Sequence, residues 1–421
     1  MLPHRCTKPV DGGNAMRNDI SLPGIPRRMA WLSASLLAVA AMTPNPARPQ
    51  PAPLKVGQFL DITGGGASAA EAGKLGIDMA VQEINAAGGV AGRRIVMLVA
   101  DTQTDPTVGV GEIKRLVQQE KVEMVFGPLI SQVLLAVLPV VNEAKIPQFG
   151  ATGSELITPQ AAPYYFSVLI NAESQAKAMV NQAERVLGAK SGAIISDSGA
   201  QAKSFVDAMK REMAARGIRL TGTQEYQYRA TDMTPQLLAL KRGNPDTLFL
   251  FASSGEDAGN VLKARDDLGW NPKVTGNYTV ATFAEAVIKV AGKEALHDTT
   301  GLNYTAFTYC DANQLPKPFT EFVARAKAAN AEKAARLSMP FAATLYDGVF
   351  LMKEAVEGTG GKTDGPSVAA WIEANAGKHA GILGSLSPSA TSHFLVGSDA
   401  LSAVHPERIL AGGLQQRFDC K

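Results

Sequence analysis

The chain has 421 residues, of which 46% are hydrophobic and 19% are charged, and its 41 Lys and Arg residues nearly balance 39 Asp and Glu residues. This length predicts two or three domains with a buried core, and the composition excludes a disordered chain. A net charge of +2 gives no electrostatic basis for nucleic-acid binding, and three cysteines are too few for a disulfide scaffold.

The N-terminal segment carries the features of an export signal. A pair of arginines precedes the apolar run Met29–Met42, which is shorter than the about 20 residues that a membrane-spanning helix needs. The small residues Ala38–Ala40 offer a cleavage site, so we predict a signal peptide over residues 1–40, with Met16 as an alternative start of translation. A twin-arginine signal is the less favoured alternative.

A proline-rich linker is predicted over residues 41–53. Removal of residues 1–40 takes away five basic and two acidic residues and leaves 36 basic and 37 acidic ones, a net charge of −1. No cysteine lies at the cleavage site, so we expect no lipid anchor there. We expect the exported chain to be soluble and periplasmic.

From Leu54 onward, short β-rich runs alternate with longer helical stretches. This βα rhythm predicts a parallel sheet with helices on both faces. In the first half, strands are predicted at Leu54–Leu60, Ile95–Ala100, Val122–Phe126 and Ile146–Phe149, and helices around Ile77–Ile84, at Val108–Gln119 and at Gln132–Ala144.

The rhythm restarts after residues 164–170, which predicts a second lobe of the same α/β class rather than one very large sheet. Residues 358–366 are predicted to form a loop, and the tail from Gly384 short strands and turns. The second half contains predicted strands at Gly192–Ser196, Arg219–Tyr226, Thr247–Ala252 and Val274–Gly276, and helices at Ser174–Leu187, Lys203–Arg216, Pro235–Arg242 and Asp257–Leu268.

One motif resembles a dinucleotide-binding site. Residues 64–69 read Gly-Gly-Gly-Ala-Ser-Ala and match G-x-G-x-x-A between a strand and a helix. The acid that the fingerprint expects about 20 residues later is missing, since Asp101 is much farther away, and no tyrosine is followed by Lys four positions on. We therefore favour a flexible loop over a nicotinamide site.

Catalytic signatures are also missing. Five scattered histidines form no metal-binding pattern, and no nucleophile elbow of the form G-x-S-x-G occurs. We therefore expect non-catalytic binding, with no metal and no cofactor. The histidines lie at positions 4, 297, 379, 393 and 405.

Several segments resemble the leucine/isoleucine/valine-binding protein family, the type I solute-binding subunits of ABC importers. The resemblance extends from Leu54 to about Phe418, and Asn85–Arg93 (Asn-Ala-Ala-Gly-Gly-Val-Ala-Gly-Arg) is its most specific part. The other matching segments are Lys55–Gly57, Ala80–Ile84, Asp101–Pro106, Gly127–Leu129 and Tyr346–Asp347.

The resemblance implies two doubly wound parallel-sheet lobes joined by a three-strand hinge, with the ligand in the cleft between them. Lobe 1 would hold residues 54–169 and 305–396, and lobe 2 residues 170–304 and 397–421. It also implies a monomer that closes on a small carboxylate ligand and then docks on an ABC permease in the inner membrane.

Ligand contacts are implied at the carboxyl ends of strands, where ligands bind in open α/β sheets. Ser131 lies four residues after Gly127, as does the serine that grips the ligand carboxylate in the family. Gly150-Ala151-Thr152 matches the family's small-small-Thr ligand loop. The alternative for Ser131 is a plain helix cap.

Departures from the family pattern bear on the ligand. This chain has Ser198-Gly199-Ala200 where the family usually has an aromatic residue that covers the ligand. It has Asn277 or Tyr278 at the position where amino-acid binders of the family have a carboxylate that holds the ligand's amino group. Burial of an unpaired ammonium is costly, so we hypothesise that the ligand is an aromatic or keto acid that stacks on the ring of Tyr278. The alternative for Tyr278 is a purely structural role. The alternative anchors for an amino group are Asp61, Asp197, Glu256 and Asp257.

The predicted ligand-binding residues are thus Ser131, Gly150, Ala151, Thr152, Asp197, Ala200, Asn277 and Tyr278. Two alternative functions stay open, a sensory binding protein that acts through a receptor and an exported α/β enzyme. Cys310 and Cys420 remain after export, and the sequence leaves open whether they form a disulfide, because it does not give their separation in space.

Overall fold

The computed structural model describes residues 51–420, which belong to one compact unit. The predicted signal peptide, the alternative start at Met16 and all but the last three residues of the predicted linker lie outside the described residues. From Leu54 on, helices and strands alternate as the sequence predicts, and they build two separate sheets.

The first sheet has five parallel strands in the order β2-β1-β3-β4-β5. Its strand β1 alternates between two cores, because Val56 faces a cluster with α1 and α12 while Phe59 faces a cluster with α2 and α3. Its strands are β1 Leu54–Leu60, β2 Ile95–Asp101, β3 Met124–Phe126, β4 Gln148–Gly150 and β5 Tyr165–Ser167.

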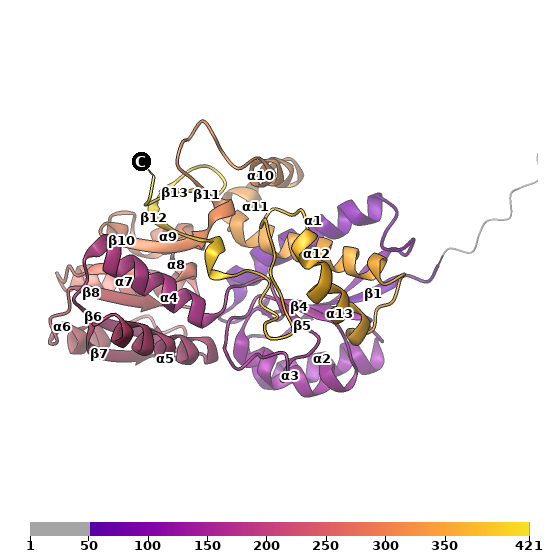
Figure 1. The fold of residues 1–421 in the computed structure, drawn as a ribbon, viewed down its shortest axis with the longest axis horizontal. Helices are drawn as coiled ribbons and strands as arrows, with labels where there is room; N and C mark the ends of the chain where they lie inside the picture. Colours follow the sequence, from indigo (N-terminus) through magenta and orange to yellow (C-terminus); the bar gives the residue numbers. More distant parts are fainter. Residues whose placement is uncertain (1–50, 421) are drawn as a thin grey trace, which may run out of the picture. The chain divides into compact units, whose positions relative to one another are not determined.

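Helices from both ends of the described chain cover this sheet. Helix α12 lies beside α1, although 250 residues of chain separate them (Figure 1). The helices are α1 Ala67–Ala86, α2 Pro106–Lys114 with a π-helical continuation at Arg115–Gln119, α3 Ser131–Glu143, α10 Lys317–Ala329, α11 Ala331–Arg336, α12 Met339–Gly358 and α13 Gly365–Asn375.

The second sheet has eight strands in the order β11-β13-β12-β10-β9-β8-β6-β7. Its five parallel strands are the four predicted for the second lobe and β10, and β12 joins antiparallel to β10. The strands are β6 Ser191–Asp197, β7 Arg219–Tyr226, β8 Thr247–Phe251, β9 Lys273–Gly276, β10 Thr299–Tyr304, β11 Thr308–Tyr309, β12 Leu401–Ile409 and β13 Gln415–Arg417.

Six helices accompany this sheet, and two of them were not predicted. Helices α8 and α9 fill the segment after β9, where Val280 and Val287 enter the core of the second lobe. The helices are α4 Ala172–Gln182 with a π-helical continuation at Ala183–Leu187, α5 Ala200–Ala215, α6 Thr234–Lys241, α7 Gly255–Asp267, α8 Tyr278–Thr282 and α9 Ala284–Ala291.

The chain passes between the sheets three times, after β5, after β11 and before β12. Strand β11 pairs with β13 of the second sheet, although the predicted lobe 1 segment began at residue 305. The crossover therefore lies a few residues later than predicted, because the short β11 completes the second sheet before α10 begins. The predicted loop at 358–366 also ends earlier, since α13 begins at Gly365.

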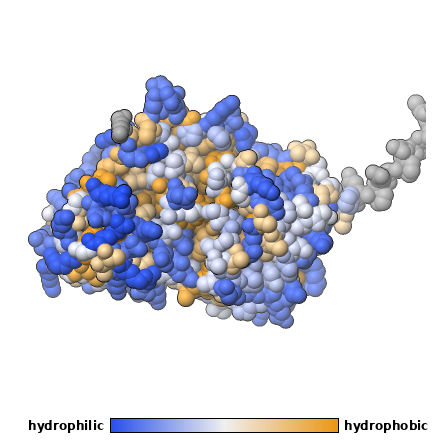
Figure 2. Space-filling view, in the orientation of Figure 1, coloured by the Kyte–Doolittle hydropathy of each residue, from blue (hydrophilic) through white to orange (hydrophobic). Residues whose placement is uncertain are grey.

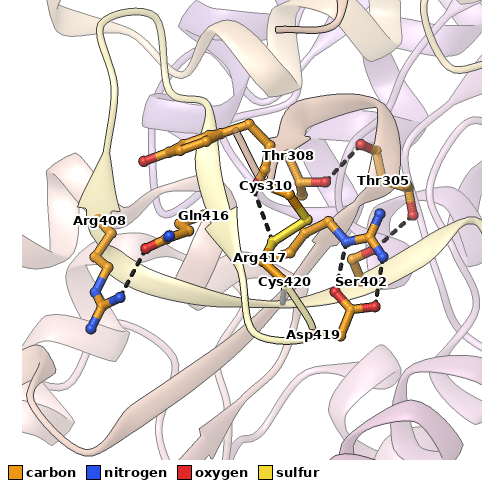
Figure 3. The surroundings of a disulfide bond; sticks show 10 residues. Thr305, Thr308, Cys310, Ser402, Arg408, Gln416, Arg417, Asp419 and Cys420 are labelled. Carbon is orange, nitrogen blue, oxygen red and sulfur yellow. Dashed lines mark hydrogen bonds and ion pairs between the residues drawn. A yellow bond between two sulfur atoms is a disulfide. The ribbon is translucent and has the colours of Figure 1, made fainter. Parts of the chain in front are cut away.

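A disulfide joins Cys310, just after β11, to Cys420 at the C-terminal end (Figure 3). The Cα atoms lie 5.1 Å apart, inside the usual range for a bridge. Beside the bridge, Arg417 forms an ion pair with Asp419 at 2.6 Å (Figure 3). The question that the sequence left open is thus answered by the packing of β11 next to β13.

The close crossing of α1 and α12 allows a stability prediction. A Cβ added to Gly76 would lie 1.9 Å from the carbonyl oxygen of Ala342, whereas one added to Gly73 would lie 3.5 Å from Leu345 Cγ. We expect Gly76→Ala to lower the free energy of unfolding by about 1–3 kcal/mol through overpacking. Gly73→Ala, in the same helix, is expected to be neutral or to stabilise by about 0.5–1 kcal/mol.

Urea unfolding of both variants checks this prediction. Equal stability of the two variants would contradict the close approach of the helices at Gly76.

Candidate functional site

A small cavity lies between the two lobes. Residues at the carboxyl ends of strands in both sheets line it, which is where open α/β sheets bind ligands. The lining residues are Ala69, Leu129, Ile130, Ser131, Gln132, Ala151, Leu169, Gln175, Gly199, Ala200, Gln201, Phe251, Ser253, Tyr278, Thr279, Phe283 and Phe341.

Aromatic rings form much of the cavity wall. Tyr278 packs against Tyr304 with ring centroids 5.2 Å apart, and Phe283 packs against Phe341 at the same distance. Each of these four rings is at least nine-tenths buried. The wall is therefore suited to an apolar or aromatic ligand group.

The polar part of the lining carries no formal charge. Its side chains are hydroxyls and amides, and within residues 51–420 no Asp, Glu, Lys, Arg or His lines this cavity. A charged ligand group would therefore depend on hydrogen bonds and backbone dipoles. The polar lining residues are Ser131, Gln132, Gln175, Gln201, Ser253 and Thr279, besides the tyrosine.

Two helices begin at the cavity, one from each lobe. Helix α3 starts after its N-cap Ile130 and α5 after its N-cap Gly199, and neither start is capped by a side chain. The first N–H groups of a helix have no partner within the helix, and the helix dipole places partial positive charge there. The arrangement can bind a carboxylate between the two lobes.

Four predicted site residues line the cavity, namely Ser131, Ala151, Ala200 and Tyr278. The alternative role of Ser131 as a helix cap is wrong, because the cap position belongs to Ile130. The Ser131 Oγ instead accepts a hydrogen bond from the Gly153 N–H at 3.3 Å. That bond ties the start of α3 to the loop after β4.

The other four predicted site residues lie behind the lining. The Thr152 hydroxyl lies 2.7 Å from the Tyr165 hydroxyl, and Gly150 ends β4. The Asn277 side chain bonds both main-chain groups of Ala252, at 3.3 and 3.1 Å.

Asp197 accepts hydrogen bonds from the N–H groups of Gly199 and Ser253, at 2.8 and 2.7 Å. Burial raises the pKa of its carboxyl group. Asp197 thus holds two loops whose residues line the cavity. In this structure it positions the site rather than entering it.

The alternative anchors for an amino group also lie outside the lining. Asp61 accepts hydrogen bonds from the Thr102 hydroxyl at 2.5 Å and from the Leu129 N–H at 2.9 Å, and burial raises its pKa to about 6. Glu256 accepts a hydrogen bond from Ser68 of the first lobe at 3.2 Å.

Asp257 accepts a hydrogen bond from the Arg229 N–H at 3.2 Å, and burial raises the pKa of its carboxyl group to about 7. A carboxyl with a raised pKa in the folded state stabilises the fold fully below its unfolded value near 3.8, and this contribution is lost as the pH rises to about 7. Asp257→Asn keeps the acceptor oxygen but does not titrate.

We therefore expect Asp257→Asn to flatten the fall in melting temperature between pH 4 and pH 7, as measured by thermal unfolding across that range. Asp207→Asn, at an exposed position of α5, is the control and should leave the slope as in the unaltered protein. An unchanged slope in the Asp257 variant would count against the raised pKa.

Sequence reasoning missed most of the aromatic wall. Phe251, Phe283 and Phe341 come from β8, from the turn between α8 and α9, and from α12. Phe251 is the last residue of β8 and the last but one of the predicted strand Thr247–Ala252, and this place at a strand end is a signal that could have found it. Phe283 and Phe341 lie in segments with no motif.

Two features of residues 51–420 bear on other classes of protein. No helix between residues 51 and 420 is long and apolar enough to cross a membrane. In the same range, the side chains that come close enough to share a metal ion are Cys310, Asp419 and Cys420, and the two sulfurs there are bonded to each other.

Figure 2 shows hydrophilic residues over much of one face, with hydrophobic residues exposed between them.

Residues 53–397 match the sequence profile of a periplasmic binding protein family. The chain belongs to this family. A curated relative, the Leu/Ile/Val-binding protein homolog 7 of Brucella abortus, is 27% identical over 285 residues, which cover 64% of this chain and 69% of the relative. The resemblance drawn from the sequence is confirmed, and a periplasmic location follows from the family.

Solved structures share the fold. A type 1 periplasmic binding protein from Bordetella pertussis Tohama I has a TM-score of 0.75 at 23% identity and covers 84% of this chain and 96% of its own. The predicted two-lobe α/β class is thereby confirmed as the type I periplasmic binding protein fold.

Two similar structures contain ligands. The substrate-binding protein LivJ from Streptococcus pneumoniae, in complex with isoleucine, has a TM-score of 0.72 at 20% identity and covers 86% of this chain and 97% of its own. A solute-binding protein of an ABC transporter from Rhodopseudomonas palustris BisB5, in complex with 3,4-dihydroxybenzoic acid, has a TM-score of 0.72 at 23% identity, with coverage of 87% and 97%.

Proposed function

We propose that this periplasmic binding protein is the solute-binding subunit of an ABC importer, and that its ligand is a small carboxylate without an α-amino group, such as an aromatic or keto acid. The observation that carries the proposal is the cavity lining, which joins two uncapped helix starts to an aromatic wall and contains no acidic side chain.

The two charged groups of an amino acid would fare differently in this cavity. A carboxylate gains from the free N–H groups at the starts of α3 and α5. Among residues 51–420, an ammonium in this cavity would meet hydroxyls, amides and aromatic rings but no carboxylate, and an unpaired buried charge is costly. The ring of Tyr278 offers a stacking surface for an aromatic acid.

The ligands named for two similar structures support this range of chemistry. Isoleucine and 3,4-dihydroxybenzoic acid both carry a carboxylate, and the second has no amino group. The same fold thus accommodates ligands of both kinds. The composition of the cavity favours the second kind for this chain.

Lobe closure supplies the mechanism. The lobes contact each other beside the cavity, where the Ser154 and Ser204 hydroxyls lie 3.2 Å apart. A ligand that contacts both lobes favours the closed state by its difference in affinity for the two states. The closed monomer would dock on a membrane permease, with residues 1–40 as the cleaved export signal. No bond chemistry is required.

A thermal-shift screen of the exported chain tests the ligand class with matched pairs. Phenylpyruvate and phenylalanine, and likewise 4-methyl-2-oxopentanoate and leucine, differ only at the α-carbon, which carries a keto oxygen in the first of each pair and an amino group in the second. A ligand at 100 times its dissociation constant stabilises by about 2.7 kcal/mol, which is easily measured. We expect stabilisation by keto acids or benzoates. Stabilisation by leucine and phenylalanine alone would overturn the ligand class.

The importer role needs a separate test. We expect the ligand-loaded protein to stimulate ATP hydrolysis by its permease complex, reconstituted in proteoliposomes. Stimulation of a chemoreceptor pathway without uptake of the ligand would support the sensory alternative instead.

A further inference from the structure

The Gly-rich turn after β1 lies against the opposite lobe. A Cβ added to Gly65 would lie 2.2 Å from Cε1 and 2.7 Å from Cζ of Tyr228, and 3.0 Å from Cδ of Arg229. Both of these residues belong to the loop between β7 and α6 in the second lobe. The ring of Tyr228 also packs against the hydrophobic cluster that β1, α2 and α3 form in the first lobe.

The neighbouring glycines, Gly64 and Gly66, are packed against atoms of their own lobe. A Cβ at Gly64 would lie 2.4 Å from the Gln103 carbonyl oxygen, and one at Gly66 would lie 2.6 Å from Asp61 Cβ. Gly65 differs, because its nearest atoms all come from the other lobe and its φ is not positive. An alanine at position 65 therefore meets an obstacle only when the two lobes are in contact.

We propose that Tyr228 and Gly65 form a latch that holds the lobes closed, so that Tyr228 sets ligand affinity without touching the ligand. Tyr228 does not line the cavity. The second lobe holds its backbone in place, since the Tyr228 N–H donates to the Ser198 hydroxyl at 3.4 Å and the next N–H, of Arg229, donates to Asp257 at 3.2 Å.

The latch acts through the ring of Tyr228 rather than through its hydroxyl. The Tyr228 hydroxyl is buried and has no hydrogen-bond partner within residues 51–420. A buried unsatisfied polar group is unfavourable, so Tyr228→Phe should keep the latch or strengthen it. Tyr228→Ala removes the ring that fills the space above Gly65 and should favour the open state.

The inference rests on the two-lobe fold and needs no assigned ligand, so its test uses the protein alone. The Ser68 hydroxyl and a Glu256 carboxylate oxygen lie 3.2 Å apart across the same rim, next to the latch. Cysteines placed at these two positions, Ser68→Cys and Glu256→Cys, report closure through the rate at which a short bismaleimide cross-links them. The native bridge leaves no other thiol in the described chain to react.

We expect Tyr228→Ala to slow cross-linking by about tenfold, because burial of the ring favours closure, and Tyr228→Phe to leave the rate unchanged or raise it. Gly65→Ala should slow cross-linking when Tyr228 is present and have no further effect in the Tyr228→Ala background. Thermal unfolding of each variant confirms that it is folded.

Two results would overturn the latch. One is cross-linking of Tyr228→Ala at the rate of the parent. The other is an equal effect of Gly65→Ala with and without the tyrosine ring, which would show that the ring is not what position 65 meets on closure. If Tyr228→Ala does not fold, the test uses Gly65→Ala in the parent protein and in the Tyr228→Phe variant. The proposal requires that Gly65→Ala slows cross-linking in both, and an unchanged rate in either would overturn it.

Discussion

Ala200→Asp is expected to abolish carboxylate binding while leaving the protein folded. Ala200 is the first residue of α5 and lines the cavity between the lobes. A carboxylate there suits the helix, because acidic residues at a helix start stabilise it by about 0.3–1 kcal/mol. The same carboxylate would occupy the position at which a ligand carboxylate meets the helix dipole.

Charge repulsion sets the size of the effect. Two like charges about 4 Å apart repel by about 4 kcal/mol at an effective dielectric constant of about 20, and each 1.4 kcal/mol changes an affinity about tenfold. We therefore expect the dissociation constant of the ligand found in the screen to rise by about a hundredfold or more, as measured by isothermal titration calorimetry.

Ala200→Asn is the matched control, because it has nearly the shape of the aspartate without its charge. Its loss of affinity should be about tenfold or less, since only a steric effect remains. Equal losses in both variants would show that size rather than charge matters at position 200. Unchanged affinity in Ala200→Asp would mean that the ligand carboxylate does not lie at the start of α5.

Replacement of Cys310 and Cys420 by serine is expected to lower the free energy of unfolding by about 2–4 kcal/mol. The bridge joins residues separated by 110 positions, so it restricts a long loop of the unfolded chain. It also fastens the end of the chain to the segment that leads from β11 to α10 (Figure 3). Urea unfolding of the double variant measures the loss.

Reductant supplies the control for the disulfide. It should destabilise the unaltered protein to the level of the double serine variant and leave that variant unchanged. Thiol titration of the exported protein should detect free thiols only after reduction. A count of two thiols without reductant would contradict the bridge.

Much of the fold could be predicted because its strands and helices are marked locally. The predicted strand Leu54–Leu60 has the same bounds in the structure, and the helix predicted from Gln132 begins one residue earlier. Buried parallel strands give short apolar runs, and the helices between them show an apolar face. Helix α8 could not be predicted in this way, because it has five residues and all of them are buried, and α9 was missed because it is only eight residues long.

The candidate site could be predicted only where it follows the ends of strands. Ser131, Ala151 and Ala200 lie there, and all three line the cavity. Phe283 and Phe341 reach the same cavity from α8–α9 and α12, and their meeting depends on how the lobes pack. The positions of Asp197 and Asn277 behind the lining depend on main-chain hydrogen bonds that no sequence pattern reveals.

The Gly-rich turn shows which features local sequence patterns predict and which arise only from packing. A two-lobe α/β chain with a turn between β1 and α1 could be predicted from the residues alone, because local periodicity and turn residues specify elements and their order. The contact of Gly65 with Tyr228, the bridge between Cys310 and Cys420, and a cavity lining without acidic side chains among residues 51–420 emerge only in the folded chain. These are contacts between residues far apart in the chain, and they arise from packing and burial over the whole fold.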